Sequence, residues 1–155
     1  MYRRMLVAVD GSVASLFALQ EAIGLATEQG AAMRIIHVIQ SVAMLGAEGP
    51  DLDALDDRWH REARAILDYA LSEARRAGVA VEAALVENER RGISETIVAE
   101  ARLWGADLIV MGTHDHRGIR HLLVRGVTAG AIDSAPVPVL LVRAPAHAID
   151  ESRSA

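Results

Sequence analysis

The sequence of 155 residues contains no cysteine and no lysine. Without cysteine there is no disulfide, no thiolate nucleophile and no cysteine-ligated metal, so thiol redox chemistry is excluded. Without lysine there is no Walker phosphate loop, whose pattern requires Gly-Lys before a hydroxyl residue. The formal charge of −5 gives no support for a nucleic-acid partner, because affinity for phosphate backbones depends largely on Lys and Arg.

Long apolar runs are also missing. In the N-terminal MYRRMLVAVD, about five apolar residues separate the arginines from Asp10, too few for a signal-peptide core or a membrane span. We therefore expect a cytoplasmic protein with no membrane partner. The length suits one domain, which we place at residues 1–146, with a disordered tail at 147–155.

Aromatic residues make up only 3% of the chain, whereas 52% is hydrophobic. A core of Ala, Val, Leu and Ile is typical of β-branched strands covered by Ala- and Leu-rich helices. Buried-type apolar runs alternate with helical periodicity along the whole chain. The predicted strands are 5–9, 33–39, 79–86, 106–111 and 137–142, and the predicted helices are 15–29, 51–77, 94–104 (opened by Ser94) and 117–133.

This alternation predicts an α/β fold, a single open five-stranded parallel sheet with helices on both faces. Such sheets bind ligands beyond the carboxyl ends of their strands, where the strand order reverses. Two segments follow strands at that edge: Asp10 after the first strand, and MGTHDHRGIRHLLVRG, 111–126, after the fourth. The sequence therefore places a candidate site between them.

Four stretches together carry a family resemblance: VAVDGS, IIHVI, GADLIVMGTH and APVPVLLVR. From Arg4 to Arg143 the chain resembles the universal stress protein family. The resemblance implies a Rossmann-like sheet of order 3-2-1-4-5, related to the adenine-nucleotide α-hydrolases, and usually a homodimer. Many members bind ATP or related adenine nucleotides and others do not, so no cofactor is required, ATP, ADP or AMP is possible, and Mg²⁺ is expected only with nucleotide.

In the nucleotide-binding members, the loop after the fourth strand reads G-x-x-G, nine residues, then Gly followed by Ser or Thr. Gly112 matches the first position, but Asp115, Arg125 and Gly126 depart from the other three. A carboxylate about 4 Å from a phosphate charge costs on the order of 4 kcal/mol at an effective dielectric of about 20. We therefore expect weak ATP binding or none.

The adenosine half of the family site is better matched. Asp10 corresponds to the acidic residue that meets the ribose, and Val38 to a residue that lines the adenine; Ala8 and Met111 complete an apolar slot, with His114 beyond it. Another explanation exists for both matches, because Asp10 is a good capping or turn residue and Val38 can simply be core.

Basic residues crowd into the same loop: His114, His116, Arg117, Arg120, His121 and Arg125. One interpretation is that these residues form an anion site near a helix N-terminus. The other is that they form a solvated basic face of an acidic protein, which could lie at a contact between subunits. A metal site of His114, Asp115 and His116 is disfavoured, because in an extended loop the two histidines share a side while Asp115 faces away, and no further set of ligands is evident.

Catalytic motifs are absent: the sequence has neither G-x-S-x-G nor H-E-x-x-H. Asp10 and His114 could form an acid–base pair, but two such residues at a ligand edge more often bind than react. We expect a non-catalytic, stress-response or regulatory binding module. The alternative is an ATP or AMP sensor with at most slow ATP hydrolysis.

The last predicted strand is an apolar edge, which needs a cover. Pro136 and Pro138 agree with an edge position, since proline is not tolerated in a central strand. In the family this strand pairs antiparallel with its two-fold mate. The expected homodimer contacts are Val137, Val139, Leu140 and Leu141.

Overall fold

The computed structural model describes residues 1–41, 49, 51–88, 91–113, 130–131 and 133–148. The statements below concern these residues. The strands are β1 (Arg4–Ala8), β2 (Ala32–Gln40), β3 (Val81–Asn88), β4 (Leu108–Thr113) and β5 (Val139–Arg143). The helices are α1 (Val13–Gln29), α2 (Leu52–Arg76) and α3 (Ile93–Trp104).

The five strands form one sheet in the order β3-β2-β1-β4-β5, and every neighbouring pair is parallel. This confirms the predicted fold class and strand order. The central strand β1 pairs with β2 on one side and β4 on the other, so Ala8 lies between Ile36 and Met111. The point where the chain direction across the sheet reverses is therefore between β1 and β4.

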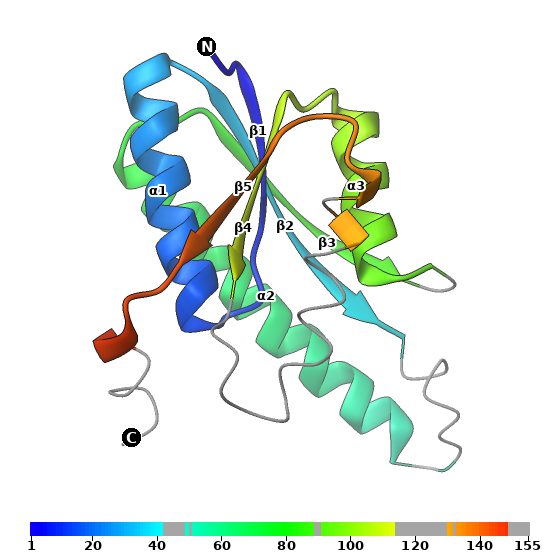
Figure 1. Cartoon of the computed structure of the whole chain (residues 1–155). Helices are drawn as coiled ribbons and strands as arrows, with labels where there is room; N and C mark the ends of the chain where they lie inside the picture. Colours follow the sequence, from blue (N-terminus) through cyan, green and yellow to red (C-terminus); the bar gives the residue numbers. More distant parts are fainter. Residues whose placement is uncertain (42–48, 50, 89–90, 114–129, 132, 149–155) are drawn as a thin grey trace.

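Helices cover both faces of the sheet (Figure 1), as predicted. Helices α1 and α2 pack on one face around a core that includes Met5, Val7 and Ile35. Helix α3 packs on the other face with Ala131, around a core that includes Leu6 and Ile109. Successive residues of β1 alternate between the two cores because side chains of a strand point to opposite faces.

The helix ends follow their capping chemistry. Helix α1 begins two residues earlier than predicted, because the Ser12 hydroxyl accepts a hydrogen bond from the Ser15 N–H at 3.2 Å. Helix α3 was predicted to open at Ser94, and that is wrong. Its N-cap is Gly92, whose N–H donates to Glu95 Oε2 at 3.2 Å, so the carboxylate three residues on satisfies the first orphan donor.

The last strand begins at Val139, not at Val137 as predicted. Proline has no N–H to donate, and Pro138 joins the ladder only through its carbonyl, which accepts from the Ile109 N–H at 3.0 Å. Val137 therefore precedes the strand, half-buried against the α3-side core. Val137 stays a predicted dimer contact, but from the segment before β5 and not from the strand itself.

The predicted helix 117–133 lies mostly outside the described residues. Of its C-terminal end, residues 130–131 and 133–134 are helical, and Ala131 is fully buried. Residues 146–148 form one short helical turn, and 149–155, in the predicted tail, lie outside the described residues. Among the helices that the structure describes, none has the length and apolar content needed to cross a membrane.

A histidine on α2 connects that helix to the end of β3. His60 Nδ1 lies 2.8 Å from the Asp56 carbonyl oxygen, and Nε2 lies 2.6 Å from Glu87 Oε1. Both oxygens can only accept, so both ring nitrogens must donate, which requires the charged imidazolium. The hydrogen bond to Glu87, with a smaller contribution from the Asp56 backbone, raises the pKa of His60.

This contact predicts that stability depends on pH. The folded pKa of His60 lies above its unfolded value of 6.5, so the stabilisation is complete below pH 6.5 and is lost as pH rises through the folded pKa. The loss is about 0.5–1 kcal/mol, because Glu87 is half-exposed. Urea unfolding between pH 5.5 and 9 should show wild type losing this stability relative to Glu87→Gln. Parallel pH curves for the two proteins would contradict the assignment.

Candidate functional site

The carboxyl ends of β1, β2 and β4 form an apolar floor on the α3 side of the sheet. Met111 is 5% exposed, and Ala8 and Val38 are half-buried against the same core. Ala8 is paired with Met111 across the strand reversal. The three residues predicted for the apolar slot thus lie against one core on this face of the sheet, at the ends of their strands.

Asp10 follows this floor directly, in a tight turn between β1 and α1. Its Oδ1 accepts a hydrogen bond from the Ser12 N–H at 2.9 Å, and its own N–H donates to Ser15 Oγ at 3.3 Å. The turn role suggested by the sequence is therefore real. The side chain is nevertheless exposed, so the turn holds an accessible carboxylate in position at the carboxyl edge of the sheet.

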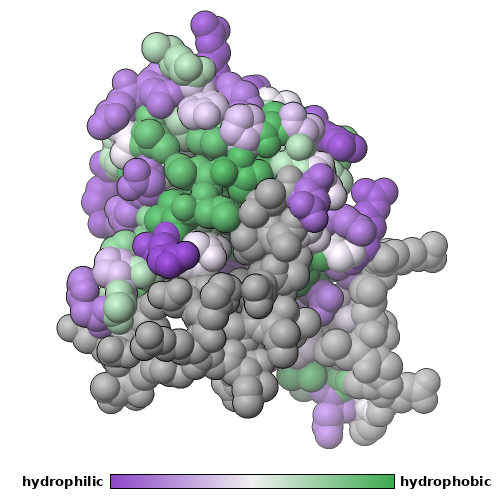
Figure 2. Space-filling model, in the orientation of Figure 1, coloured by the Kyte–Doolittle hydropathy of each residue, from purple (hydrophilic) through white to green (hydrophobic). Residues whose placement is uncertain are grey.

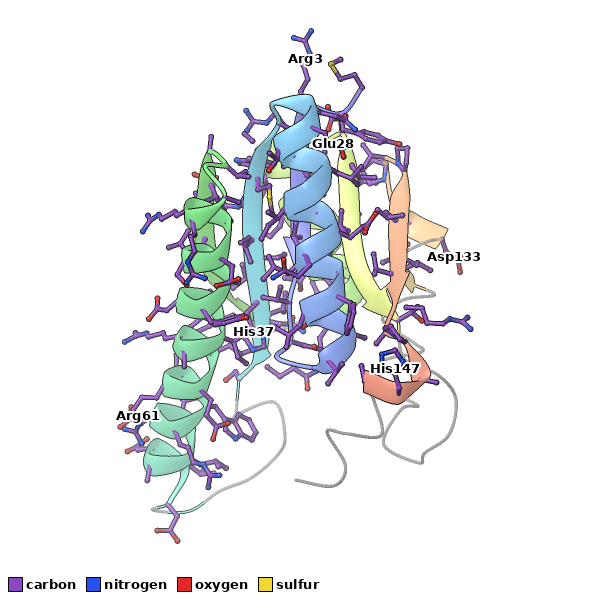
Figure 3. The ribbon with its side chains drawn as sticks, turned by 90° about the vertical axis from the view of Figure 1, so that its left-hand side faces the viewer. Arg3, Glu28, His37, Arg61, Asp133 and His147 are labelled. Carbon is purple, nitrogen blue, oxygen red and sulfur yellow. The ribbon has the colours of Figure 1, made fainter. Side chains whose placement is uncertain are left out.

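A second contact, which the sequence reasoning missed, fixes the strand end that carries Asp10. His37 of β2, which is labelled in Figure 3, has Nδ1 2.6 Å from the Val9 carbonyl oxygen. The Val9 N–H donates to the Ile36 carbonyl at 2.9 Å. The carbonyl can only accept, so Nδ1 carries the proton. The sequence signal for this contact was His37 itself, a polar side chain within the apolar run IIHVI, which needs a hydrogen-bond partner if it is buried.

Gly112 of β4 has a steric role that the phosphate-loop pattern did not reveal. A Cβ built on it would lie 2.5 Å from the Ala14 carbonyl carbon and 2.7 Å from the Ser15 nitrogen. The end of β4 therefore packs directly on the backbone of the first turn of α1. The match of Gly112 to the family loop does not by itself point to phosphate, because this close approach already requires glycine.

The remaining predicted loop residues lie outside the described part of the chain. This applies to the loop departures and to the basic cluster: His114, Asp115, His116, Arg117, Arg120, His121, Arg125 and Gly126. The structure thus brings together one half of the predicted site, Ala8, Asp10, Val38, Met111 and Gly112. Among the described residues, no group of three or more His, Asp or Glu side chains could hold a metal ion.

The model of the universal stress protein family matches residues 1–143. The chain belongs to this family. A curated relative, universal stress protein YxiE of Bacillus subtilis, is 30% identical over 151 residues, covering 92% of this chain and 100% of the relative. The match therefore spans the full length of that relative.

Solved structures of universal stress proteins have a fold similar to that of this chain. A universal stress family protein from Burkholderia pseudomallei is 33% identical, with a TM-score of 0.73 and coverage of 92% of this chain and 97% of the other. The universal stress protein from Archaeoglobus fulgidus in complex with dAMP is 25% identical, with a TM-score of 0.65 and coverage of 91% and 98%. In the present chain, the strand order β3-β2-β1-β4-β5 places Asp10 and the apolar floor where the order reverses, between β1 and β4.

Proposed function

We propose that this universal stress protein is a non-catalytic regulatory binding module in the stress response, which takes an adenine nucleotide at the carboxyl ends of β1 and β4. The observation that carries the proposal is the fixed Asp10 carboxylate beside the floor of Ala8, Val38 and Met111. A carboxylate suits ribose hydroxyls, which donate hydrogen bonds, and an apolar floor suits a base.

We further propose that AMP or another adenine monophosphate binds more tightly than ATP. The Archaeoglobus relative in complex with dAMP supports a monophosphate ligand in this family. Asp115 stands at a position where the family loop has glycine, and a carboxylate there opposes a triphosphate more strongly than a single phosphate, since repulsion grows with the ligand's charge.

The two serine hydroxyls beside Asp10 already make hydrogen bonds within the turn, which supports a binding role over a catalytic one. Ser12 Oγ accepts from the Ser15 N–H, and Ser15 Oγ donates to the Ser12 carbonyl at 3.1 Å. An ATP or AMP sensor with slow ATP hydrolysis is the alternative. Micromolar affinity for ATP in the presence of Mg²⁺, with release of phosphate, would favour it.

Calorimetric titration with AMP, ADP and ATP, with and without Mg²⁺, tests the proposal on protein first checked by mass spectrometry for bound nucleotide. We expect AMP to bind more tightly than ATP. Asp10→Ala should weaken AMP binding by about 10-fold or more, since a hydrogen bond to a charged group contributes about 1.5–3 kcal/mol.

Asp107→Ala is the matched control for this titration. Asp107 also accepts backbone hydrogen bonds, from the Arg3 and Arg4 N–H groups at 2.8 and 2.9 Å, but at the opposite end of the sheet. Its replacement should leave AMP affinity unchanged. The site assignment fails if both aspartates, or neither, affect binding.

We also propose that β5 joins two copies of the chain. Val139 and Leu141 pack on the α3-side core and Leu140 on the opposite core, all half-buried at the sheet edge. Hydrophobic residues gather on the surface where β5 lies (Figure 2), and among the described strands β5 pairs with β4 alone, so it forms an apolar edge of the sheet. Sedimentation at tens of micromolar should show a dimer, and Leu140→Asp should shift it toward monomer; a clean wild-type monomer would refute the proposal.

A further inference from the structure

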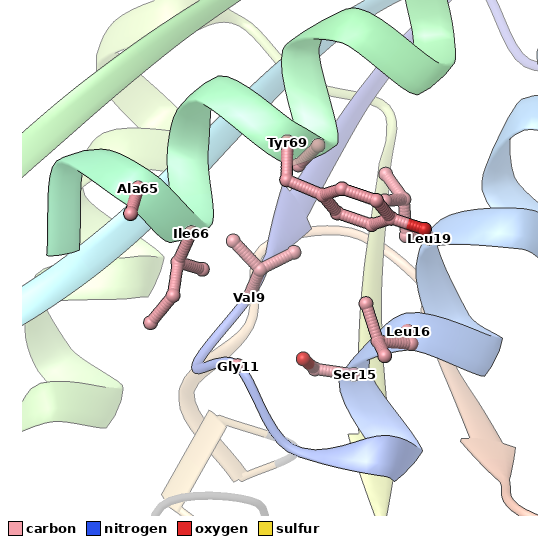
Figure 4. Close-up of a pocket in the computed structure, with 9 residues that line it drawn as sticks. Val9, Gly11, Ser15, Leu16, Leu19, Ala65, Ile66 and Tyr69 are labelled. Atoms are coloured by element: carbon pink, nitrogen blue, oxygen red, sulfur yellow. The ribbon is translucent and has the colours of Figure 1, made fainter. Parts of the chain in front are cut away.

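An apolar cavity of about 380 Å³ lies between α1 and α2 (Figure 4), on the face of the sheet opposite to the apolar floor of Ala8, Val38 and Met111. Leu16 and Leu19 of α1 line one side, Ile66 and Tyr69 of α2 line the other, and Val9 lies between them. The cavity is therefore distinct from the proposed nucleotide site, although Val9 and Asp10 are adjacent in the chain.

Small residues keep this space open. Gly11 lines the cavity with a φ of +78°, which favours glycine, and a Cβ there would lie 2.8 Å from Ile66 Cδ1. Ala65 and Ala70 of α2 also line it. A longer side chain at any of these three positions would occupy part of the space, so the volume depends on their small size.

The chemistry of the lining selects against charge. Among the described residues that line the cavity there is no acidic or basic side chain. The Ser15 hydroxyl already donates to the Ser12 carbonyl, which leaves the Tyr69 hydroxyl as the group suited to one hydrogen bond. A buried charge without a partner is costly, whereas an uncharged apolar ligand would cover the exposed parts of Leu16 and Tyr69, which are 39% and 49% exposed.

The volume falls within the range of about 300–1,000 Å³ found for small-molecule pockets. We propose that this cavity is a second binding site of the protein, for a small uncharged molecule, apolar or aromatic, with at most one hydrogen-bonding group. The occupant sits between α1 and α2, against Val9 and Leu19, with its polar group toward Tyr69. The site does not depend on the proposed nucleotide function.

Titration with the uncharged fluorophore N-phenyl-1-naphthylamine tests the proposal on the full chain without nucleotide. We expect a saturable rise in fluorescence with about one probe per chain and a Kd on the order of 100 µM, ordinary for a ligand of this size. Ala65→Phe should fill the cavity from its exposed edge and weaken binding about 10-fold or more. Absence of saturable binding to the wild type overturns the proposal.

Ala54→Phe is the matched control, because Ala54 is an exposed residue of the same helix that does not line the cavity. It adds the same ring to the surface and should change the Kd less than about two-fold. Leu16→Gln, compared with Leu103→Gln on exposed Leu103 of α3, gives a second test that does not require a larger side chain. Equal loss of binding in a variant and its control overturns the proposal, as does no loss in Ala65→Phe and Leu16→Gln.

Discussion

Replacing Asp115, Arg125 and Gly126 together by Gly, Gly and Ser will tighten ATP binding by about two to three orders of magnitude. Removing a carboxylate about 4 Å from phosphate gains on the order of 4 kcal/mol at an effective dielectric of about 20, less where water or Mg²⁺ intervenes. The serine hydroxyl adds roughly 0.5–1.5 kcal/mol. Each 1.4 kcal/mol is about tenfold in Kd.

Calorimetry with ATP and AMP on the triple variant and on Asp115→Gly alone measures this effect. The single change should give most of the gain for ATP, and AMP should gain less because it carries less charge. The three positions follow from the sequence pattern alone. No gain for ATP in the triple variant would show that the family loop does not align with these residues, and would leave the Asp10 site untouched.

Gly112→Ala will cost about 3 kcal/mol of unfolding free energy. The added methyl would lie 2.5 Å from the Ala14 carbonyl carbon and 2.6 Å from its oxygen, and backbone atoms in a helix cannot rotate away as a side chain can. Overpacking of this kind costs typically about 1–3 kcal/mol, occasionally more. Relief requires β4 and α1 to separate, which also disturbs the edge that carries Asp10.

Urea unfolding measures the loss, and Gly24→Ala is the control. Gly24 lies inside α1, and a Cβ there would meet nothing within 4 Å. Its replacement should stabilise the protein by about 0.5–1 kcal/mol, because alanine loses less conformational freedom in a helix than glycine. If Gly112→Ala is as stable as wild type, then the close contact between β4 and α1 is not as the structure describes it.

The fold was predictable because its signals are local. The strand run MRIIHVI is mostly apolar, as is typical of strands in a parallel sheet. Gly30, directly after α1, adopts the left-handed conformation that favours glycine. The errors arose where two residues competed for one role. Ser94 has a hydroxyl that could cap the helix, but the Gly92 N–H donates to the Glu95 carboxylate and the helix begins earlier. Val137 continues the apolar pattern, but Pro138 after it has no N–H and pairs only through its carbonyl.

The site was predictable only in part. Ala8 and Met111 share a face because they are paired across β1 and β4, and Val38 shares it because it lies two residues after Ile36, the β2 partner of Ala8. The contact of His37 with the Val9 carbonyl and the packing of Gly112 on Ala14 were not predicted, because each depends on the detailed approach of two segments and not on which face a residue occupies. The cavity between α1 and α2 depends on the spacing of two helices, which no sequence pattern specifies.

The strand order also determines when the sheet can be completed during synthesis. β1 is made first and becomes the central strand, but its two neighbours come from opposite parts of the chain, so Leu6 pairs with Arg34 on one side and with Ile109 on the other. Pairing over such separations is slow. A nascent chain that ends before Ile109 therefore lacks one partner of its central strand, and we expect such a chain to aggregate more readily than the complete one.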